Sequence, residues 1–204
     1  MPANPRVFIS YSHDDETHRV RVLAFAQALR THGIDADLDQ FHGETIVDWP
    51  SWCREKMERE ASDFVLCVCT AEYRRRIHNQ VPPEQGRGVY WEGSLIQQEL
   101  YDAKGNLRFI PVLFDDEAES SIVDILHGWT HCRIAAFELT DGGYELLYRI
   151  LTKQARVEPA PVGALVTLPT ERHPGSPAAA VSAVGSTPST PAAPMAVELA
   201  HLPK

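Results

Sequence analysis

Two glutamates are the side chains of this sequence best suited to catalysis. Glu92 follows Trp91 at the expected start of a helix, and Glu99 lies two helical turns further on. A carboxylate held beside a sugar can stabilise the positive charge that develops as a glycosidic bond breaks. Position favours Glu92, which we place nearer the carboxyl ends of the strands. A structural role stays open, since a glutamate in the first turn also stabilises a helix through its dipole.

Hydroxyl groups and aromatic rings lie near the same predicted strand ends. Ser10, Tyr11 and Ser12 end the first apolar run and could hydrogen-bond a ribose or a phosphate, although Ser10 could equally face the core. An aromatic face can stack on a flat ring of a ligand. The candidates for stacking are Phe41, Trp49 and Trp91.

The sequence carries no pattern for a metal ion or a tightly bound phosphate. The four cysteines include no pair with zinc spacing, so we expect buried free thiols. Histidines 13, 42 and 78 show no metal-binding pattern, and neither glycine-rich phosphate motif is present. Acidic residues after Ser12 would repel a phosphate from the next helix start. We therefore expect no metal site and no resident cofactor.

Two segments are candidate interaction surfaces. The loop from Gln40 to Asp48 contains apolar residues that have little reason to lie in a loop unless something covers them: Phe41, Ile46 and Val47. These residues could also fold back onto their own domain. A basic run could meet a diphosphate or an acidic partner, although a solvated charged face explains it more simply: Arg74, Arg75 and Arg76.

The apolar pattern alternates between strand and helix periods. It predicts strands at 7–11, 34–38, 64–69, 108–114 and 132–137. Helices are expected along 22–29, from Pro50, from Trp91 to Ala103 and from Tyr144 to Thr152. Pro111 within the fourth strand indicates an edge or a bulge.

Strands separated by helices predict an α/β domain with a doubly wound sheet. We expect a flavodoxin-like fold, with five parallel strands and helices on both faces. In such folds a ligand lies beyond the carboxyl ends of the strands. The site should therefore draw on the segments after Tyr11, after Asp39 and from Thr70 to Glu92.

Composition separates one folded domain from a tail. Of 204 residues, 44% are hydrophobic, yet the last aromatic residue is Tyr148. We predict a domain over 1–155 and a disordered linker over 156–204, because 159–194 contains eight prolines and eight alanines. The net charge of -9 makes nucleic acid or an anionic membrane a poor partner. We expect a cytoplasmic protein, and the linker could lead to a further domain.

A family resemblance rests on several motifs in order. The segments RVFISYSHDD, GIDADLDQ, WPSWCREKMEREASDFVLCVCTAEYRRR, VYWEGSLIQQELYDAKG and RFIPVLF resemble the SEFIR branch of the TIR-domain superfamily, over about Arg6 to Thr152. A response-regulator receiver shares the fold but is disfavoured, since the third strand ends at Cys69 and Thr70 instead of an aspartate.

The resemblance implies immune or defence signalling by assembly, as a homo-oligomer or filament. Many TIR domains, once assembled, also cleave the nicotinamide–ribose bond of NAD, and the Trp91-Glu92 pair matches the motif that holds their catalytic acid. Glu99-Leu100 echoes a second TIR pair, so Glu99 is the alternative acid. The loop from Gln40 to Asp48 corresponds to the TIR assembly loop. SEFIR domains of animal receptors look like assembly modules without catalysis, which keeps a non-enzymatic adaptor as the alternative function.

Overall fold

The computed structural model describes residues 3–80, 87–102, 104–106 and 108–171, with the backbone alone described for Pro50 and residues 87–92. The chain divides into two units, Met1–Pro159 and Ala160–Lys204. All helices and strands described below belong to the first unit. Residues 158–171 are exposed and carry no helix or strand. The rest of the predicted linker lies outside the described residues.

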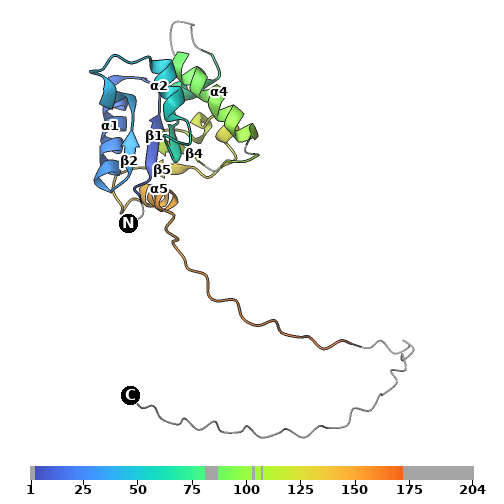
Figure 1. Ribbon diagram of the computed structural model, residues 1–204. Coiled ribbons are helices and arrows are strands. Elements are labelled where there is room, and N and C mark those ends of the chain that lie inside the picture. The colour runs from blue at the N-terminus through green and yellow to red at the C-terminus, as the bar shows by residue number, and fades with distance from the viewer. Residues whose placement is uncertain (1–2, 81–86, 103, 107, 172–204) are drawn as a thin grey trace, which may run out of the picture. The chain divides into compact units, whose positions relative to one another are not determined.

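A parallel sheet forms the centre of the first unit (Figure 1). Its strands are β1 (Arg6–Ser10), β2 (Asp35–Asp37), β3 (Phe64–Val68), β4 (Phe109–Phe114) and β5 (Cys132–Ile134). They pair in the order β2-β1-β3-β4-β5, and every pair is parallel. This is the flavodoxin-like order, so the predicted fold class is confirmed.

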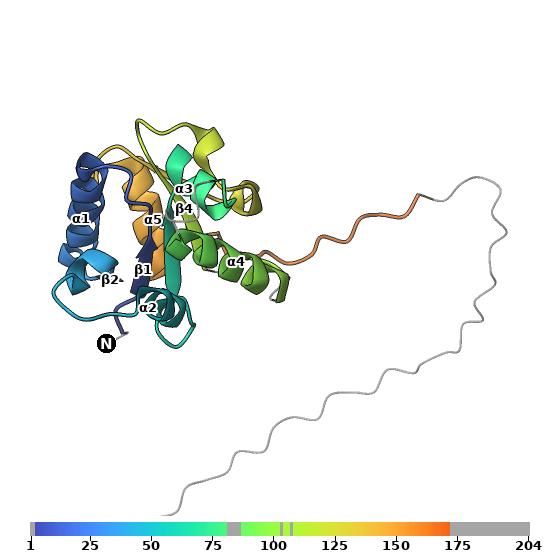
Figure 2. The ribbon, with the colours of Figure 1, turned by 90° about the horizontal axis from the view of Figure 1, so that it is seen from above.

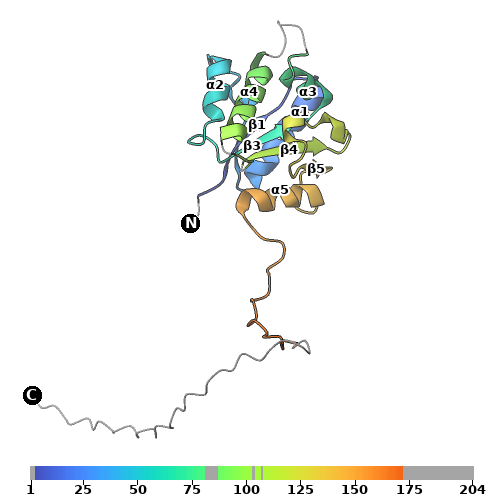
Figure 3. The same ribbon diagram turned by 90° about the vertical axis from the view of Figure 1, so that its right-hand side faces the viewer.

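In the described part of the chain, five α-helices cover the sheet on both faces. They are α1 (Glu16–Thr31), α2 (Trp49–Lys56), α3 (Ala71–Ile77), α4 (Arg87–Asp102) and α5 (Gly142–Thr152), and short 3₁₀ turns occur at Asp39–His42, Glu119–Ser121 and Asp124–Leu126. The core on one face is shared by α1 and α5, and the core on the other by α2, α3 and α4. Figure 2 shows α1 and α4 on opposite sides of the sheet, and Figure 3 shows α2 beside α4.

Alternation along the strands explains the two cores. In β1, Val7 and Ile9 join the core beneath α1 and α5, whereas Phe8 points to the opposite core. In β3, Leu66 and Val68 face the first core and Val65 and Cys67 the second. Successive side chains of a strand point to opposite faces. Continuous apolar runs therefore cover both sides of the sheet.

Pro111 lies inside the sheet, not at an edge or a bulge as its sequence suggested. Pro111 is opposite Cys67 of β3, and the pairing of β4 with β5 begins one residue later, at Val112 opposite Cys132. Hydrogen bonds to β3 involve the carbonyl groups of Arg108 and Val112, which leaves residue 111 facing the other side. β5 does not reach that position, so the missing N–H costs no bond between strands.

The largest differences from the sequence prediction concern α3, α4 and β5. α3 was not anticipated; it begins after Thr70, whose hydroxyl accepts a hydrogen bond from the Tyr73 amide at 3.0 Å. α4 begins at Arg87 instead of Trp91, so Glu92 lies in the second turn of the helix. β5 ends at Ile134 instead of Phe137, because its partner strand β4 ends opposite at Phe114.

Candidate functional site

The hydroxyl groups that end β1 are buried and have partners within the domain. The Oγ of Ser10 lies 2.7 Å from the hydroxyl of Tyr73, and the Oγ of Ser12 lies 3.2 Å from the Oγ1 of Thr70. Ser12 also donates to the carboxylate of Asp14. Ser10 and Ser12 are both almost fully inaccessible to solvent. These hydroxyls join the loop after β1 to the start of α3. A ligand could bind them only by replacing their present hydrogen-bond partners.

Asp39 joins the loops after β1 and β2. Its Oδ1 accepts a hydrogen bond from the Tyr11 hydroxyl at 2.8 Å, and its Oδ2 lies 2.6 Å from Nε2 of His13. Burial alone would raise the pKa of Asp39, but hydrogen bonds from His13 and Tyr11 outweigh it and leave the pKa below its usual value. Burial, together with the charge of Asp39, raises the pKa of Tyr11. Asp39 is therefore an anion at neutral pH and Tyr11 a neutral donor.

The N-terminus of α1 beside this network is acidic. Asp15 caps the helix by accepting a hydrogen bond from the His18 amide at 2.7 Å, and Glu16 is the first helical residue. Carboxylates complement the positive end of the helix dipole. The same charges oppose a phosphate at this position, as the sequence predicted.

Glu99 lies at the opposite edge of the sheet, where the strands begin. Its Oε2 lies 3.1 Å from Nη1 of Arg108, which immediately precedes β4, and its Oε1 lies 2.7 Å from Nη2 of Arg59. The side chain of Arg108 is only 2% exposed. Sequence reasoning did not find this pair, although an arginine directly before an apolar strand was a signal for a buried cation. Glu99 therefore compensates a buried charge away from the carboxyl ends.

Glu92 lies seven residues before Glu99 in α4, about 10 Å along the helix axis. The contact of Glu99 with the start of β4 shows that α4 runs antiparallel to the strands. The backbone of Glu92 therefore lies nearer the carboxyl ends than that of Glu99. The structure describes only the backbone of Trp91 and Glu92, not their side chains. Next to them, α4 packs closely on α3, because a Cβ at Gly93 would lie 2.7 Å from Cγ2 of Ile77.

The predicted assembly loop is anchored at its base and exposed at its tip. Phe41 is partly buried against the core, and Nε2 of His42 lies 2.8 Å from Oδ1 of Asp37. Ile46 is fully exposed, whereas Val47 is partly buried. Trp49, at the start of α2, is 40% exposed. Of the three apolar loop residues, Phe41 has packing partners in its own domain and Ile46 projects into solvent.

The basic run of α3 is paired with carboxylates of its own domain. Arg74 pairs with Asp124 at 2.7 Å, and both Arg75 and Arg76 pair with Glu72. Arg76 also donates to the backbone carbonyl of His13 at 3.2 Å. These contacts favour a solvated, internally paired face over a free diphosphate site.

Metal binding and membrane crossing find no support in the described part of the chain. Within it, no group of three or more histidine, cysteine or acidic side chains is arranged to hold a metal ion. No helix there is both long and apolar enough to cross a membrane.

Comparisons with known proteins agree with the fold. A sequence model of the SEFIR domain matches residues 5–141. The chain is also similar to the crystal structure of a prokaryotic SEFIR domain, with a TM-score of 0.53 and 26% sequence identity, over 78% of this chain and 100% of that one. No curated protein matches the chain.

Proposed function

Because the chain belongs to the SEFIR domain family and is therefore a TIR-like signalling module, we propose that it acts by self-assembly and that the assembled domain cleaves the nicotinamide–ribose bond of NAD. Signalling in innate immunity or antiphage defence is the role proposed for this activity. NAD is the substrate and no separate cofactor takes part.

The exposure of Ile46 is the observation that carries the assembly proposal. An isoleucine side chain fully in solvent contributes nothing to the folded core, while Phe41 and His42 at the start of the loop are anchored to the domain. Covering such a side chain on association removes apolar surface from water. This burial stabilises the complex by about 25 cal/mol per Å² of apolar area. A second copy of the domain is the proposed partner, since the loop corresponds in position to the assembly loop of TIR domains.

The position of Glu92 supports the catalytic part. Glu99, the other candidate acid, is engaged by Arg108 and Arg59 at the edge where the strands begin. Glu92 lies nearer the carboxyl ends and in the second helical turn, where helix-dipole stabilisation has weakened. The nicotinamide of NAD leaves as a neutral group, so one carboxylate that stabilises the charge developing on the ribose suffices. We assign this role to Glu92.

The Asp39 network supplies a physical link between assembly and chemistry. Asp39 directly precedes Gln40, the first residue of the assembly loop, and it binds Tyr11 and His13 after β1. A contact made by the loop therefore acts on the segment beside the proposed substrate site. In the proposal, Ser10, Tyr11 and Ser12 shape that segment, while Trp91 and Trp49 supply rings for the substrate. The Phe41 ring instead packs on its own core, beside Arg30.

The burial of the β1 hydroxyls favours a second candidate function, a non-enzymatic adaptor. Ser10 and Ser12 have partners inside the domain, and the acidic start of α1 opposes a diphosphate. A domain of this kind would signal by association with other SEFIR or TIR domains alone.

Nicotinamide release at rising protein concentration distinguishes the two functions. The full chain is incubated with NAD at concentrations that span the onset of large species in sedimentation. We expect release per domain to rise steeply at that onset. Large species that release no nicotinamide would establish the adaptor and refute catalysis, and a chain that stays monomeric throughout would refute self-assembly.

A further inference from the structure

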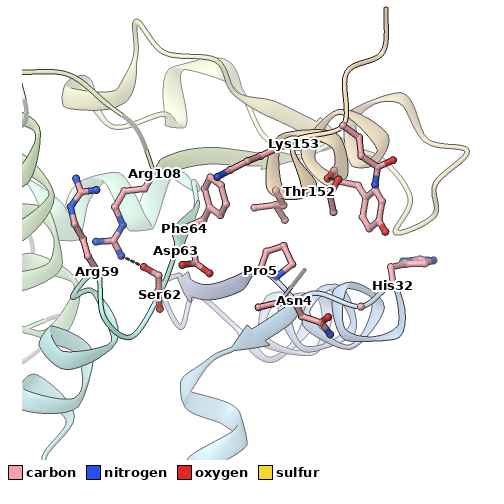
Figure 4. A pocket seen from close by; sticks show the side chains of 15 residues that line it. Asn4, Pro5, His32, Arg59, Ser62, Asp63, Phe64, Arg108, Thr152 and Lys153 are labelled. Atoms are coloured by element: carbon pink, nitrogen blue, oxygen red, sulfur yellow. Dashed lines mark hydrogen bonds between the residues drawn. The ribbon is translucent and has the colours of Figure 1, made fainter. Parts of the chain in front are cut away.

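We propose that the edge of the sheet where the strands begin carries a binding site for a small organic anion, with a phosphate or carboxylate group on a flat or apolar body. This site is separate from the proposed NAD site and does not depend on catalysis or assembly. It is a pocket of about 790 Å³, within the usual range for small-molecule sites. Figure 4 shows it between the turns that precede the strands and the end of α5.

The charged side chains of the pocket leave positive charge without a partner. Arg59, Arg108 and Lys153 line it, and Asp63 is the acidic residue among the described lining residues. Asp63 is already paired with Arg6 at 3.0 Å. Arg59 and Arg108 share the single carboxylate of Glu99. The pocket is therefore cationic, although the whole chain has a net charge of -9.

Arg108 is held rigidly at the wall of this pocket. Its Nη1 donates to the carbonyl oxygen of Met57 at 2.8 Å and its Nη2 to that of Ser62 at 2.9 Å. The side chain is 2% exposed, and its buried Nε has no hydrogen-bond partner among the described residues. The fixed guanidinium therefore adds a positive charge beside the pocket.

Lys153 supplies a further cation. It forms no ion pair with any residue that the structure describes. In Figure 4 its side chain reaches from the end of α5 over Phe64, toward the side on which Arg108 lies. The partly buried ring of Phe64, with Pro5 and Leu151, provides the apolar wall for the body of the ligand. The pocket thus combines an anion-binding end with an apolar surface.

Two lysines in the same backbone conformation allow a matched test. Lys153 has φ 56° and Lys104 has φ 50°, both in the left-handed region that glycine adopts freely. Lys153→Gly therefore removes the ammonium group from the pocket without backbone strain. Lys104→Gly makes the same change at an exposed turn that does not line the pocket.

Isothermal titration calorimetry of the full chain tests the proposal with four probes. AMP carries a phosphate on a flat body, indole-3-acetate carries a carboxylate, and adenosine and inorganic phosphate each supply one half of the ligand. We expect saturable binding of AMP or indole-3-acetate, and at least tenfold weaker binding of adenosine and phosphate. Lys153→Gly and Arg59→Gln should each raise the Kd of the bound probe about tenfold. Lys104→Gly and Glu92→Ala should leave that Kd unchanged.

Four results would overturn the proposal. They are no saturable binding of AMP or indole-3-acetate, adenosine binding as tightly as AMP, an equal loss in Lys104→Gly, and a loss in Glu92→Ala. The last would place the probe at the proposed NAD site. Thermal unfolding without a probe verifies that each variant is folded. Failure of NAD cleavage leaves these outcomes unchanged, so the two proposals are tested independently.

Discussion

The Nε2 atom of His13 lies 2.6 Å from the Oδ2 atom of Asp39, which joins the loop after β1 to the loop after β2. The other oxygen of Asp39 accepts the Tyr11 hydroxyl. Two segments 26 residues apart are thus fixed at the carboxyl edge by one carboxylate. This arrangement makes Asp39 the structural connection between the predicted assembly loop and the segment after β1.

Asp39 should stabilise the domain in a pH-dependent manner. Its pKa in the folded state lies below the usual 3.8, so its contribution is present above that pH and is lost as the pH falls through the folded-state value. We expect Asp39→Asn to lower the free energy of unfolding by about 2 kcal/mol at pH 7, the scale of hydrogen bonds to a charged group. Urea unfolding should show this difference shrinking below pH 3.8.

Asp35→Asn is the control for that measurement. Asp35 is exposed and pairs with Arg30 at the surface. Surface pairs contribute little to stability. A loss in Asp39→Asn that is no larger than in Asp35→Asn, or that persists unchanged at low pH, would contradict the role assigned to the Asp39 carboxylate.

Glu99 should matter for stability because it compensates buried Arg108. Glu99→Ala removes the carboxylate and leaves the guanidinium with backbone carbonyl partners. We expect a loss of about 2 kcal/mol in the free energy of unfolding, below the 3–5 kcal/mol typical of fully buried pairs, because Glu99 is 24% exposed. Denaturant unfolding measures it.

Glu145→Ala is the matched change on α5, since Glu145 pairs with Arg149 at 2.7 Å on the surface. It should destabilise the domain far less than Glu99→Ala does. Equal losses in the two variants would show that Arg108 does not depend on Glu99.

Ile46→Asp should weaken assembly without disturbing the fold. Ile46 is fully exposed, so a charge there costs the monomer little, but association would bury it. Each contact recurs along an array, which multiplies the effect of one weakened interface. Sedimentation velocity should show fewer large species and circular dichroism an unchanged spectrum. Undiminished assembly would place the interface elsewhere, for instance at Arg74 to Arg76.

Phe41→Ala provides the contrast within the same loop. Phe41 packs partly against its own core. Its truncation should therefore lower the free energy of unfolding, whether or not it also weakens assembly. Thermal unfolding separates the two variants: the Tm should fall for Phe41→Ala and stay constant for Ile46→Asp. A fall in both would mean that Ile46 is part of the folded core.

The strands and their order could be predicted from sequence because short segments with a strand-like apolar pattern are separated by segments with helical spacing or turn residues. Phe64 to Val68 shows this most clearly. The helix α3 could not be predicted, since seven residues carry little periodicity and the helix depends on the Thr70 cap and on burial of Tyr73 and Ile77. The early end of β5 at Ile134 depends on tertiary contacts, because β4 ends opposite it at Phe114.

The sequence gives an expected place for the candidate site, at the carboxyl edge of the sheet, but not the contacts of its residues. Parallel strands indicate the carboxyl edge, and the seven-residue spacing separates Glu92 from Glu99 along one helix. The pairing of Arg108 with Glu99 and Arg59 joins three segments that have no local sequence relationship. The hydrogen bonds from Tyr11 and His13 to Asp39 also join segments far apart in the sequence. Sequence patterns place these segments near the carboxyl edge but do not predict the contacts between them.

Nicotinamide release by artificially clustered chains tests whether the assembled domain cleaves NAD and whether Glu92 is the catalytic acid. The full chain and its Glu92→Ala and Glu99→Ala variants are fused to the same tetramerising coiled coil and incubated with NAD. We expect the clustered wild type to release nicotinamide, Glu92→Ala to release none although it remains folded, and Glu99→Ala to retain part of the activity. No release by the folded, clustered wild type would contradict catalysis, and activity that survives in Glu92→Ala but disappears in a folded Glu99→Ala would move the catalytic carboxylate to Glu99.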